Sequence, residues 1–184
     1  AAQPAWAEAK TLAGGRLHGL VLNHGVFEAA SIHEEADAWR ANWARTLQVN
    51  LQSAADLARL AARDWVDGDG GSLVAISSRA AHRGDDPDHP AYAASKAGLI
   101  ALIKTLARAY SGRGLLAYAI SPGWIDTEMA PQEPRARQAA LAEVPYGEMA
   151  QPDELGELCA FLLSGACASA TGATVDVNGA SYVR

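Results

Sequence analysis

The sequence predicts an α/β fold, a doubly wound parallel sheet with helices on both faces. Two observations lead to this prediction. Short apolar segments with the composition of strands alternate along the chain with longer segments of helical periodicity. The segments between successive strands are long enough to cross the sheet as helices, which parallel pairing requires. Because the chain has 184 residues, we expect a single domain over residues 1–184.

Four segments have the composition of strands. Each is rich in apolar residues and bounded by Gly, Pro or Asn, and they occupy residues 17–23, 71–77, 115–121 and 173–179. The first three are nearly continuous apolar runs, as expected of parallel strands that are covered on both faces.

Helical patterns lie between these strands. One long segment, about 38–65, carries apolar residues at helical spacing: Trp39, Trp43, Leu47, Leu51, Ala55 and Ala58. A second helix, about 91–110, follows Pro90. Shorter helices are expected at about 133–143 and 152–163, the latter because proline and aspartate suit a first helical turn.

Composition argues against several classes of function. A formal net charge of −6 provides no basic face for nucleic acid or for an anionic membrane, and neither partner is expected. No apolar run is as long as a membrane span and no signal segment opens the chain, so we expect a cytoplasmic protein. Cys159 and Cys167 have no disulfide or zinc spacing, and we expect buried, inert thiols and no metal site.

The ends of the four strands mark the expected ligand site. They carry Asn23-His24-Gly25, Ser77-Ser78, Pro122-Gly123 and Asn178-Gly179. In a parallel sheet the carboxyl ends lie along one edge, and ligands bind beyond that edge. The helix that follows Pro90 begins at the same edge.

Tyr92 and Lys96 share one face of that helix, because they are four residues apart. A nearby ammonium favours the phenolate, so we expect it to lower the tyrosine pKa. Such a phenol can give or take a proton at a carbonyl or alcohol oxygen, and Ser78 could hydrogen-bond the same oxygen. The alternative is a packed tyrosine and a surface lysine near a helix N-terminus. Asn50 likewise allows a solvated position or a helix kink.

Three segments resemble a known family: ISSRAAHRGDDPDHPAYAASKAG, AISPGWIDTEM and ATGATVDVNGASY. In sequence and order they are similar to the short-chain dehydrogenases/reductases, nicotinamide-dependent oxidoreductases with a Rossmann-like fold. The resemblance runs from about residue 3 to the C-terminus and is closest to the 3-oxoacyl-carrier-protein reductases and related alcohol dehydrogenases.

The resemblance implies a catalytic set. Tyr92 matches the family's acid/base, and Lys96 matches the residue that lowers its pKa and holds the nicotinamide ribose. Ser78 matches the serine that orients the substrate oxygen. Asn50 matches the asparagine that supports a water-linked proton relay to the lysine.

The resemblance also implies contacts to NAD or NADP. Pro122 and Gly123 allow a sharp turn at the strand end. By resemblance the Ile125 backbone meets the nicotinamide carboxamide, and Thr127 contacts the carboxamide or the diphosphate. The neighbouring Trp124 is expected to face either the substrate or the core.

The segment VLNHG matches the family's Asn-Asn-Ala-Gly pattern in part. Asn23 and Gly25 correspond and are assigned to the cofactor site, whereas Leu22 and His24 replace the other two residues. His24 is either beside the cofactor or a packing residue.

Two loops are expected to border the substrate. The acidic loop 83–90 has no calcium-binding spacing, so we interpret it as a solvated loop and a wall of the substrate pocket. By resemblance, residues 127–150 form a mobile lid that closes over the substrate and excludes water.

No Gly-x-x-x-Gly-x-Gly segment follows a first strand, and the resemblance begins at the family's third helix. The chain would then match the C-terminal two-thirds of the family fold and lack its first strands and helices, on the order of 60 residues. The segment GLVLN would become an apolar sheet edge prone to aggregation or strand pairing. We therefore expect this chain alone to bind a nicotinamide dinucleotide weakly if at all, and a low-micromolar affinity would refute that expectation.

The resulting hypothesis is an oxidoreductase that interconverts a ketone and a secondary alcohol, with Tyr92 as acid/base. Its substrate would be a small carbonyl or alcohol compound, and by resemblance the two long helices would pack in a homodimer or homotetramer. The alternative is a catalytically inactive fragment of the family, or a non-catalytic assembly or binding module.

Overall fold

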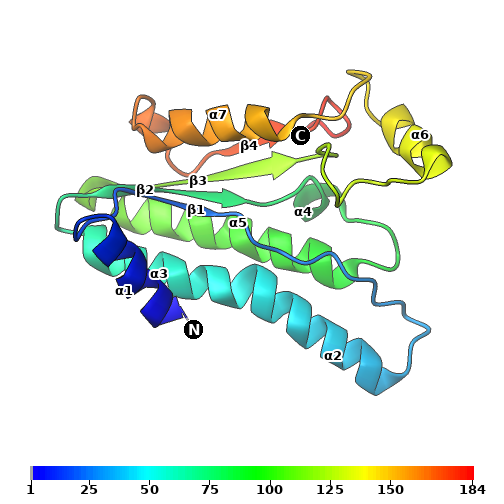
Figure 1. Cartoon of the computed structure of the whole chain (residues 1–184), viewed down its shortest axis with the longest axis horizontal. Coiled ribbons are helices and arrows are strands. Elements are labelled where there is room, and N and C mark those ends of the chain that lie inside the picture. Colours follow the sequence, from blue (N-terminus) through cyan, green and yellow to red (C-terminus); the bar gives the residue numbers. More distant parts are fainter. Residues whose placement is uncertain (1) are drawn as a thin grey trace.

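Four parallel strands form the centre of the structure, a computed structural model that describes residues 2–184 (Figure 1). Their order in the sheet is the order in the chain: β1 (Gly19–Leu22), β2 (Gly71–Ile76), β3 (Leu115–Pro122) and β4 (Thr174–Val177). Leu20 lies opposite Leu73, and Val74 opposite Tyr118, in the parallel register. The predicted α/β class with a parallel sheet is confirmed.

Helices cover both faces of the sheet. Beneath it in Figure 1 lie α1 (Ala2–Leu12), α2 (Ala36–Leu47), α3 (Ser53–Trp65) and α5 (Pro90–Tyr110), and above it lies α7 (Pro152–Leu163). The short helices α4 (Ala80–Arg83) and α6 (Pro134–Ala142) stand at the end to which the strands point. The carboxyl edge of the sheet is therefore surrounded by loops and short helices, while its centre is covered.

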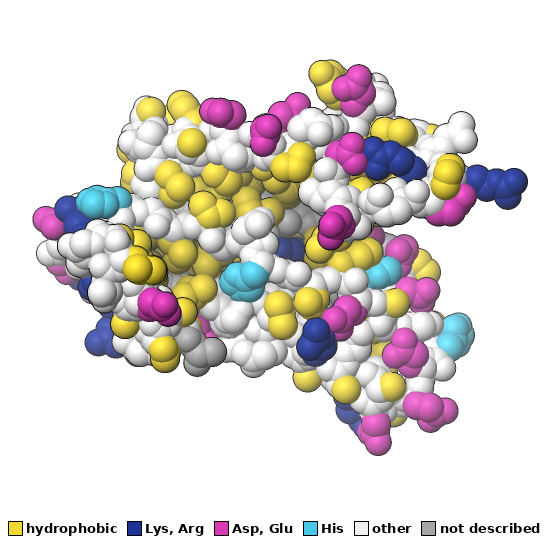
Figure 2. All heavy atoms as spheres, in the orientation of Figure 1, with side chains coloured by type: hydrophobic (Ala, Val, Ile, Leu, Met, Phe, Trp, Pro, Cys, Tyr) yellow, Lys and Arg dark blue, Asp and Glu magenta, His cyan; other side chains and the backbone are white. Residues whose placement is uncertain are grey.

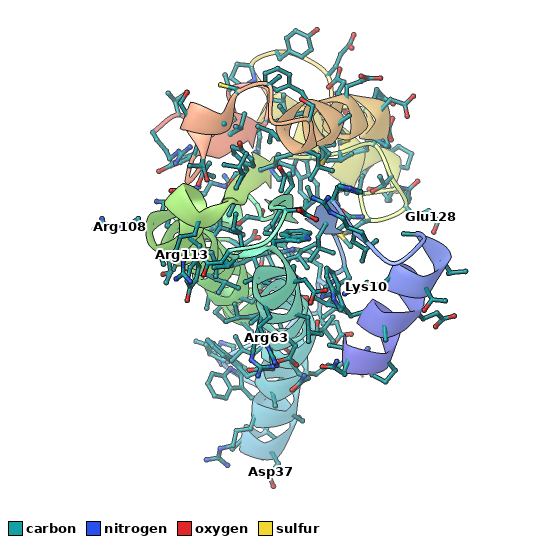
Figure 3. The ribbon with its side chains drawn as sticks, turned by 90° about the vertical axis from the view of Figure 1, so that its left-hand side faces the viewer. Lys10, Asp37, Arg63, Arg108, Arg113 and Glu128 are labelled. Carbon is teal, nitrogen blue, oxygen red and sulfur yellow. The ribbon has the colours of Figure 1, made fainter. Side chains whose placement is uncertain are left out.

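A π-helical segment, Gln48–Gln52, divides the predicted helix 38–65 into α2 and α3. Of the six apolar positions that periodicity pointed to, Ala58 is buried and the other five are partly buried, while Thr46, Asn50 and Ala54 are also buried. The wider π turn was not predicted. Figure 3 shows α2 extending away from the sheet, with Asp37 at its outer end.

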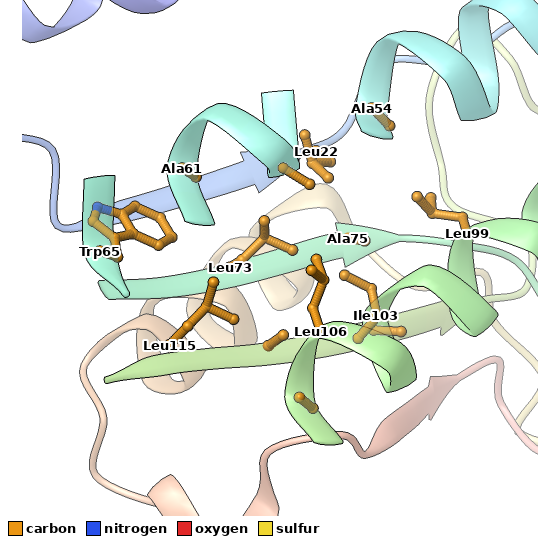
Figure 4. Close-up of a cluster of buried hydrophobic side chains, with 14 of the residues drawn as sticks. Leu22, Ala54, Ala61, Trp65, Leu73, Ala75, Leu99, Ile103, Leu106 and Leu115 are labelled. Atoms are coloured by element: carbon orange, nitrogen blue, oxygen red, sulfur yellow. The ribbon is translucent and has the colours of Figure 1, made fainter. Parts of the chain in front are cut away.

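The core has two halves because successive strand residues point to opposite faces of the sheet. Leu73 and Ala75 of β2 join the cluster between the sheet and helices α3 and α5, which Figure 4 shows together with Trp65 and Ile103. Val74 of β2 packs on the other face, in the cluster covered by α7. This burial on both faces accounts for the nearly continuous apolar sequence of the strand.

Helix α1 packs on α3 through a small polar and aromatic contact. Trp6 lies edge-on to Trp65 at 6.1 Å between ring centroids, and its indole donates to Asp64. Lys10 also donates to Asp64, at 2.8 Å, where the two helices lie side by side in Figure 3. These bonds hold the pKa of Asp64 below its usual value.

Strand β1 forms one edge of the sheet within residues 2–184. Val21 is 38% exposed on this strand, and Figure 2 shows hydrophobic side chains gathered between α7 and the region of β1. In the same described range, no helix has both the length and the apolar character that crossing a membrane requires.

Candidate active site

A cavity of about 690 Å³ opens at the carboxyl edge of the sheet. Its walls come from the ends of β1, β2 and β3, from the first turns of α5 and from α7. Nine of the ten site residues predicted from the sequence line it: Asn23, Gly25, Ser78, Tyr92, Lys96, Pro122, Gly123, Ile125 and Thr127. The structure thus brings together segments that lie as much as 100 residues apart in the chain.

Ser78 and Tyr92 face the cavity from neighbouring elements. Ser78 follows β2, and its buried hydroxyl accepts a hydrogen bond from Ala80 N at 3.1 Å. Burial raises the pKa of Tyr92 above its ordinary value; the Ser78 hydroxyl lowers this pKa and the charge of Asp85 raises it. The predicted lowering of the tyrosine pKa is therefore wrong for this structure, because removal from water outweighs the neighbouring polar groups.

Lys96 is buried in the cavity wall, with 4% of its surface exposed. Its ammonium donates to the carbonyl of Ile76 at 2.8 Å and lies 5.8 Å from the centroid of the Tyr92 ring. Burial lowers the pKa of Lys96 to about 8. An ammonium has three N–H donors, so two remain for a ligand that enters beside Tyr92.

Asn50 lies behind this wall, in the π-helical segment, and is fully buried. Its carboxamide oxygen accepts from Val26 N at 2.8 Å, and its amide nitrogen donates to Val26 O at 3.0 Å and to the Ser95 hydroxyl at 3.1 Å. Of the two sequence alternatives, the solvated position is wrong and the helix distortion is confirmed. The side chain joins the loop after β1 to helix α5.

Gly25 brings this loop close to the two polar groups. A Cβ atom at this position would lie 3.3 Å from the Lys96 ammonium and 3.4 Å from the Asn50 oxygen. The absence of a side chain leaves the edge of the cavity open beside Lys96, as a ligand in contact with bare backbone requires.

The turn after β3 is also shaped by a glycine. Gly123 N donates to Val177 O, and a Cβ at Gly123 would lie 2.9 Å from the Cβ of Asn178. Beyond it, Ile125 pairs with Ala150 in an isolated parallel bridge that fixes the base of the 127–150 segment. Trp124 lines the cavity and also packs against the buried cluster of Ala130, Ala140 and Met149, so it borders both the site and a core.

Other expected residues lie at or outside the border of the cavity. His24 is exposed and shares a 2.7 Å hydrogen bond with Ser53; burial, then the charge of Lys96, lowers its pKa. In the acidic loop, Asp86 bonds to His89 at 2.6 Å, and Asp85 lines the cavity. Within residues 2–184, no group of three or more His, Cys, Asp or Glu side chains is arranged to hold a metal ion.

Both cysteines are free and partly buried. Cys159 lines the cavity from α7, and burial raises the pKa of its thiol. A raised pKa leaves the neutral thiol of Cys159 dominant, in line with the inert role expected from the sequence. The burial expected of both thiols is only partial.

Sequence reasoning did not assign several residues of the cavity, among them Phe27 and Arg79. Arg83 lines it too and belongs to the loop 83–90 that was expected to form a wall of the pocket. Phe27 stacks on His89 with 3.8 Å between ring centroids and lies edge-on to Tyr92 at 4.8 Å. No local pattern marks an aromatic residue in an irregular loop. Arg79 directly follows Ser78, so its place after a strand end was a usable signal.

The site has the parts that the nicotinamide end of a dinucleotide needs. Lys96 has donors available for ribose hydroxyls, Gly25 leaves room beside it, and the Ile125 and Thr127 segment borders the same cavity. These residues fit the nicotinamide and its ribose.

Comparisons with known proteins agree with this geometry. A family model described as enoyl-(acyl carrier protein) reductase matches residues 2–180. A 3-oxoacyl-(acyl-carrier-protein) reductase of Thermotoga maritima is 31% identical over 90% of this chain and 66% of its own length. An acetoacetyl-CoA reductase of Synechocystis is 35% identical over 91% of this chain and 69% of its own length. A second 3-oxoacyl-(acyl-carrier-protein) reductase, of Pseudomonas aeruginosa, is 35% identical over 77% of this chain. The chain spans 57–69% of the length of these three relatives.

Proposed function

The chain belongs to the short-chain dehydrogenase/reductase family, and we propose that it interconverts a ketone and a secondary alcohol with NAD or NADP. One observation carries the proposal: Ser78, Tyr92 and Lys96 line a single cavity beside the open backbone at Gly25. The relatives include a 3-oxoacyl-(acyl-carrier-protein) reductase and an acetoacetyl-CoA reductase, and these names support a carbonyl substrate for this chain.

Tyr92 and Ser78 act on the substrate oxygen. Since burial raises the pKa of Tyr92, its phenol keeps the proton at neutral pH and is able to donate it when a carbonyl becomes an alkoxide. The Ser78 hydroxyl hydrogen-bonds the same oxygen and fixes its position. When bound, a nicotinamide supplies the hydride to the carbonyl carbon, or accepts it in the reverse direction.

Lys96 binds the ribose of the cofactor and supplies a positive charge beside the phenol. Its pKa of about 8 keeps most of the side chain protonated at neutral pH. That charge stabilises the phenolate left after proton donation, more strongly in a buried site than in water. Asn50 holds the loop after β1 in place, so that Gly25 stays beside the ammonium.

The segment 127–150 serves as the lid of this site. Two ion pairs, each at 2.8 Å, connect it to its surroundings: Glu143 of the lid pairs with Arg79 of the cavity wall, and Arg137 of the lid pairs with Asp126, the residue that precedes the lid. Met129 and Ala130 of the lid line the cavity. Closing the lid excludes water and strengthens the electrostatic contacts at the substrate oxygen.

The test is a steady-state assay of the purified chain with a panel of ketones and millimolar NADH or NADPH. We expect wild type to consume reduced cofactor and Tyr92→Phe to be at least about 100-fold slower, the usual contribution of a general acid. Tyr110→Phe, at the far end of the same helix, is the matched control and should keep its activity. Full activity in Tyr92→Phe would contradict the proposed role, and inactivity of a folded wild type would favour a non-catalytic binding module.

A further inference from the structure

Arg79 contributes a buried side chain to the wall of the cavity that the proposed oxygen-binding serine also lines. It follows Ser78 in the chain, lines the same cavity and keeps only 6% of its side chain exposed. Arg83, four residues later on α4, lines the cavity as well and is partly accessible, with 34% of its side chain exposed. Two arginines on adjacent turns therefore form part of the wall next to the reacting centre.

One carboxylate, that of Glu143, forms ion pairs with both arginines. The Oε2 atom of Glu143 accepts from Arg79 at 2.8 Å and lies 3.5 Å from Nη2 of Arg83. The Nη1 atom of Arg79 is buried and, within residues 2–184, has no hydrogen-bond partner. The two guanidinium groups therefore carry more positive charge than Glu143 neutralises and more N–H donors than Glu143 accepts.

The charges around Arg79 leave a positive surplus. Burial and the neighbouring charge of Arg83 lower the pKa of Arg79, while Glu143 and Asp85 raise it. Lys96 lines the same cavity, so three basic side chains and Asp85 line it, and Glu143 pairs with the two arginines. A buried guanidinium with unpaired donors is costly, and a further anion in the cavity would offset that cost.

We propose that Arg79 and Arg83 bind a carboxylate of the substrate, which makes the substrates oxo acids and the matching hydroxy acids. The inference rests on the proposed oxidoreductase function and specifies its substrate class. Because Arg79 and Arg83 line the same cavity as Ser78 and Tyr92, the carboxylate and the carbonyl would belong to one substrate molecule. A guanidinium fork is suited to carboxylate, since it offers two parallel N–H donors in one plane.

Two features prepare Arg79 for this role. Its guanidinium carbon lies 5.7 Å from the centroid of the Trp124 ring, which limits the orientations of the side chain. Glu143, which follows α6 in the lid, already places a carboxylate on the arginine pair. A substrate carboxylate competes with Glu143 for these donors.

The test compares an acid with its uncharged ester. Calorimetric titrations would use 4-oxopentanoate and methyl 4-oxopentanoate, in buffer with millimolar NAD⁺ and NADP⁺, oxidised cofactors that leave an oxo acid unreduced. Wild type should bind the ionised acid about tenfold more tightly than the ester, the effect of one charge-assisted hydrogen bond pair. Arg79→Met should abolish this preference, and Arg83→Met should reduce it.

Glu143→Gln provides a second arm that does not depend on the folding of the Arg79 variant. Removing the competing carboxylate should tighten binding of the acid about threefold or more and leave the ester unchanged. Equal affinities of wild type for acid and ester, or an acid affinity unchanged or weakened in Glu143→Gln, would overturn the proposal. Tyr92→Phe should still bind the acid more tightly than the ester. The binding result can therefore be interpreted even if the proposed redox function fails.

Discussion

Burial decides the chemistry of the two ionisable residues at the centre of the site. Both Tyr92 and Lys96 are shifted towards their neutral forms, because the cavity wall removes them from water. Sequence spacing predicted that the two share a helix face, and the structure confirms it. The direction of the tyrosine shift was not predictable, since it depends on enclosure by segments distant in the chain. Arg79 was missed although its place after a strand end was a usable signal.

Lys96→Met is expected to stabilise the protein at neutral pH. Wild type must bury a charge below about pH 8, where the lysine is protonated in both the folded and unfolded states. The shift from 10.5 to about 8 corresponds to roughly 3 kcal/mol, and loss of the bond to Ile76 O subtracts about 1 kcal/mol. The net expected gain at neutral pH is about 2 kcal/mol.

The stability that Lys96→Met gains over wild type should decrease as pH rises. Between about pH 8 and 10.5 the unfolded chain binds more protons at this lysine than the folded protein does, so wild type becomes more stable as pH rises. The difference between Lys96→Met and wild type should therefore shrink across that window in urea titrations. The exposed Lys104→Met, on the same helix, is the control and should show no such trend. A difference that stays constant with pH would contradict the buried charge.

Among the secondary-structure elements, close contacts between the end of a helix and the start of a strand hold the helical layer on the sheet. Trp65 ends α3 and is 2% exposed, and its indole donates to Leu17 O at 2.7 Å. Gly71 begins β2 against this ring. Periodicity and turn residues predicted the principal strands and helices to within a few residues. The π turn and the four-residue α4 have no comparable pattern, since each depends on contacts made by the folded chain.

Gly71→Ala should destabilise the protein by about 2–3 kcal/mol, because overpacking a buried site displaces rigid neighbours. The added Cβ would lie 2.3 Å from the Trp65 ring. Gly156→Ala in α7 is the matched control, since nothing lies within 4 Å of its added Cβ. This change should stabilise the helix by roughly 0.5–1 kcal/mol. Thermal unfolding of both variants checks the pair, and equal effects would contradict the assigned contact at Gly71.

In the molecule as a whole, the arrangement of strands determines where the site lies and leaves one strand with an unpaired edge. Parallel strands bring their carboxyl ends to one edge, which is why residues from Asn23 to Thr127 meet in one cavity. The rule that ligands bind at that edge pointed to the strand-end residues and to the start of α5, whereas Ile125 and Thr127 were expected only from the family resemblance. Within residues 2–184, β1 pairs only with β2, so one side of this strand remains open.

Self-association through β1 is the expected consequence of that open side, because unpaired strand edges pair with other chains. Val21→Lys places a charge on the exposed apolar position of β1 and should lower self-association in sedimentation velocity experiments at increasing concentration. Leu12→Lys, which removes an 83% exposed leucine from α1, is the control and should behave as wild type. Association that is identical in wild type and Val21→Lys would assign the contact to another surface.

The most direct test of the proposed oxidoreductase function follows the transferred hydride. The purified chain would be given reduced cofactor with deuterium at both nicotinamide C4 positions together with the ketone panel, and the alcohol product would be analysed by mass spectrometry. We expect deuterium on the carbinol carbon with wild type and its loss with Tyr92→Phe. Absence of labelled alcohol from a folded wild-type chain, or equal labelling by Tyr92→Phe, would contradict hydride transfer with Tyr92 as the acid.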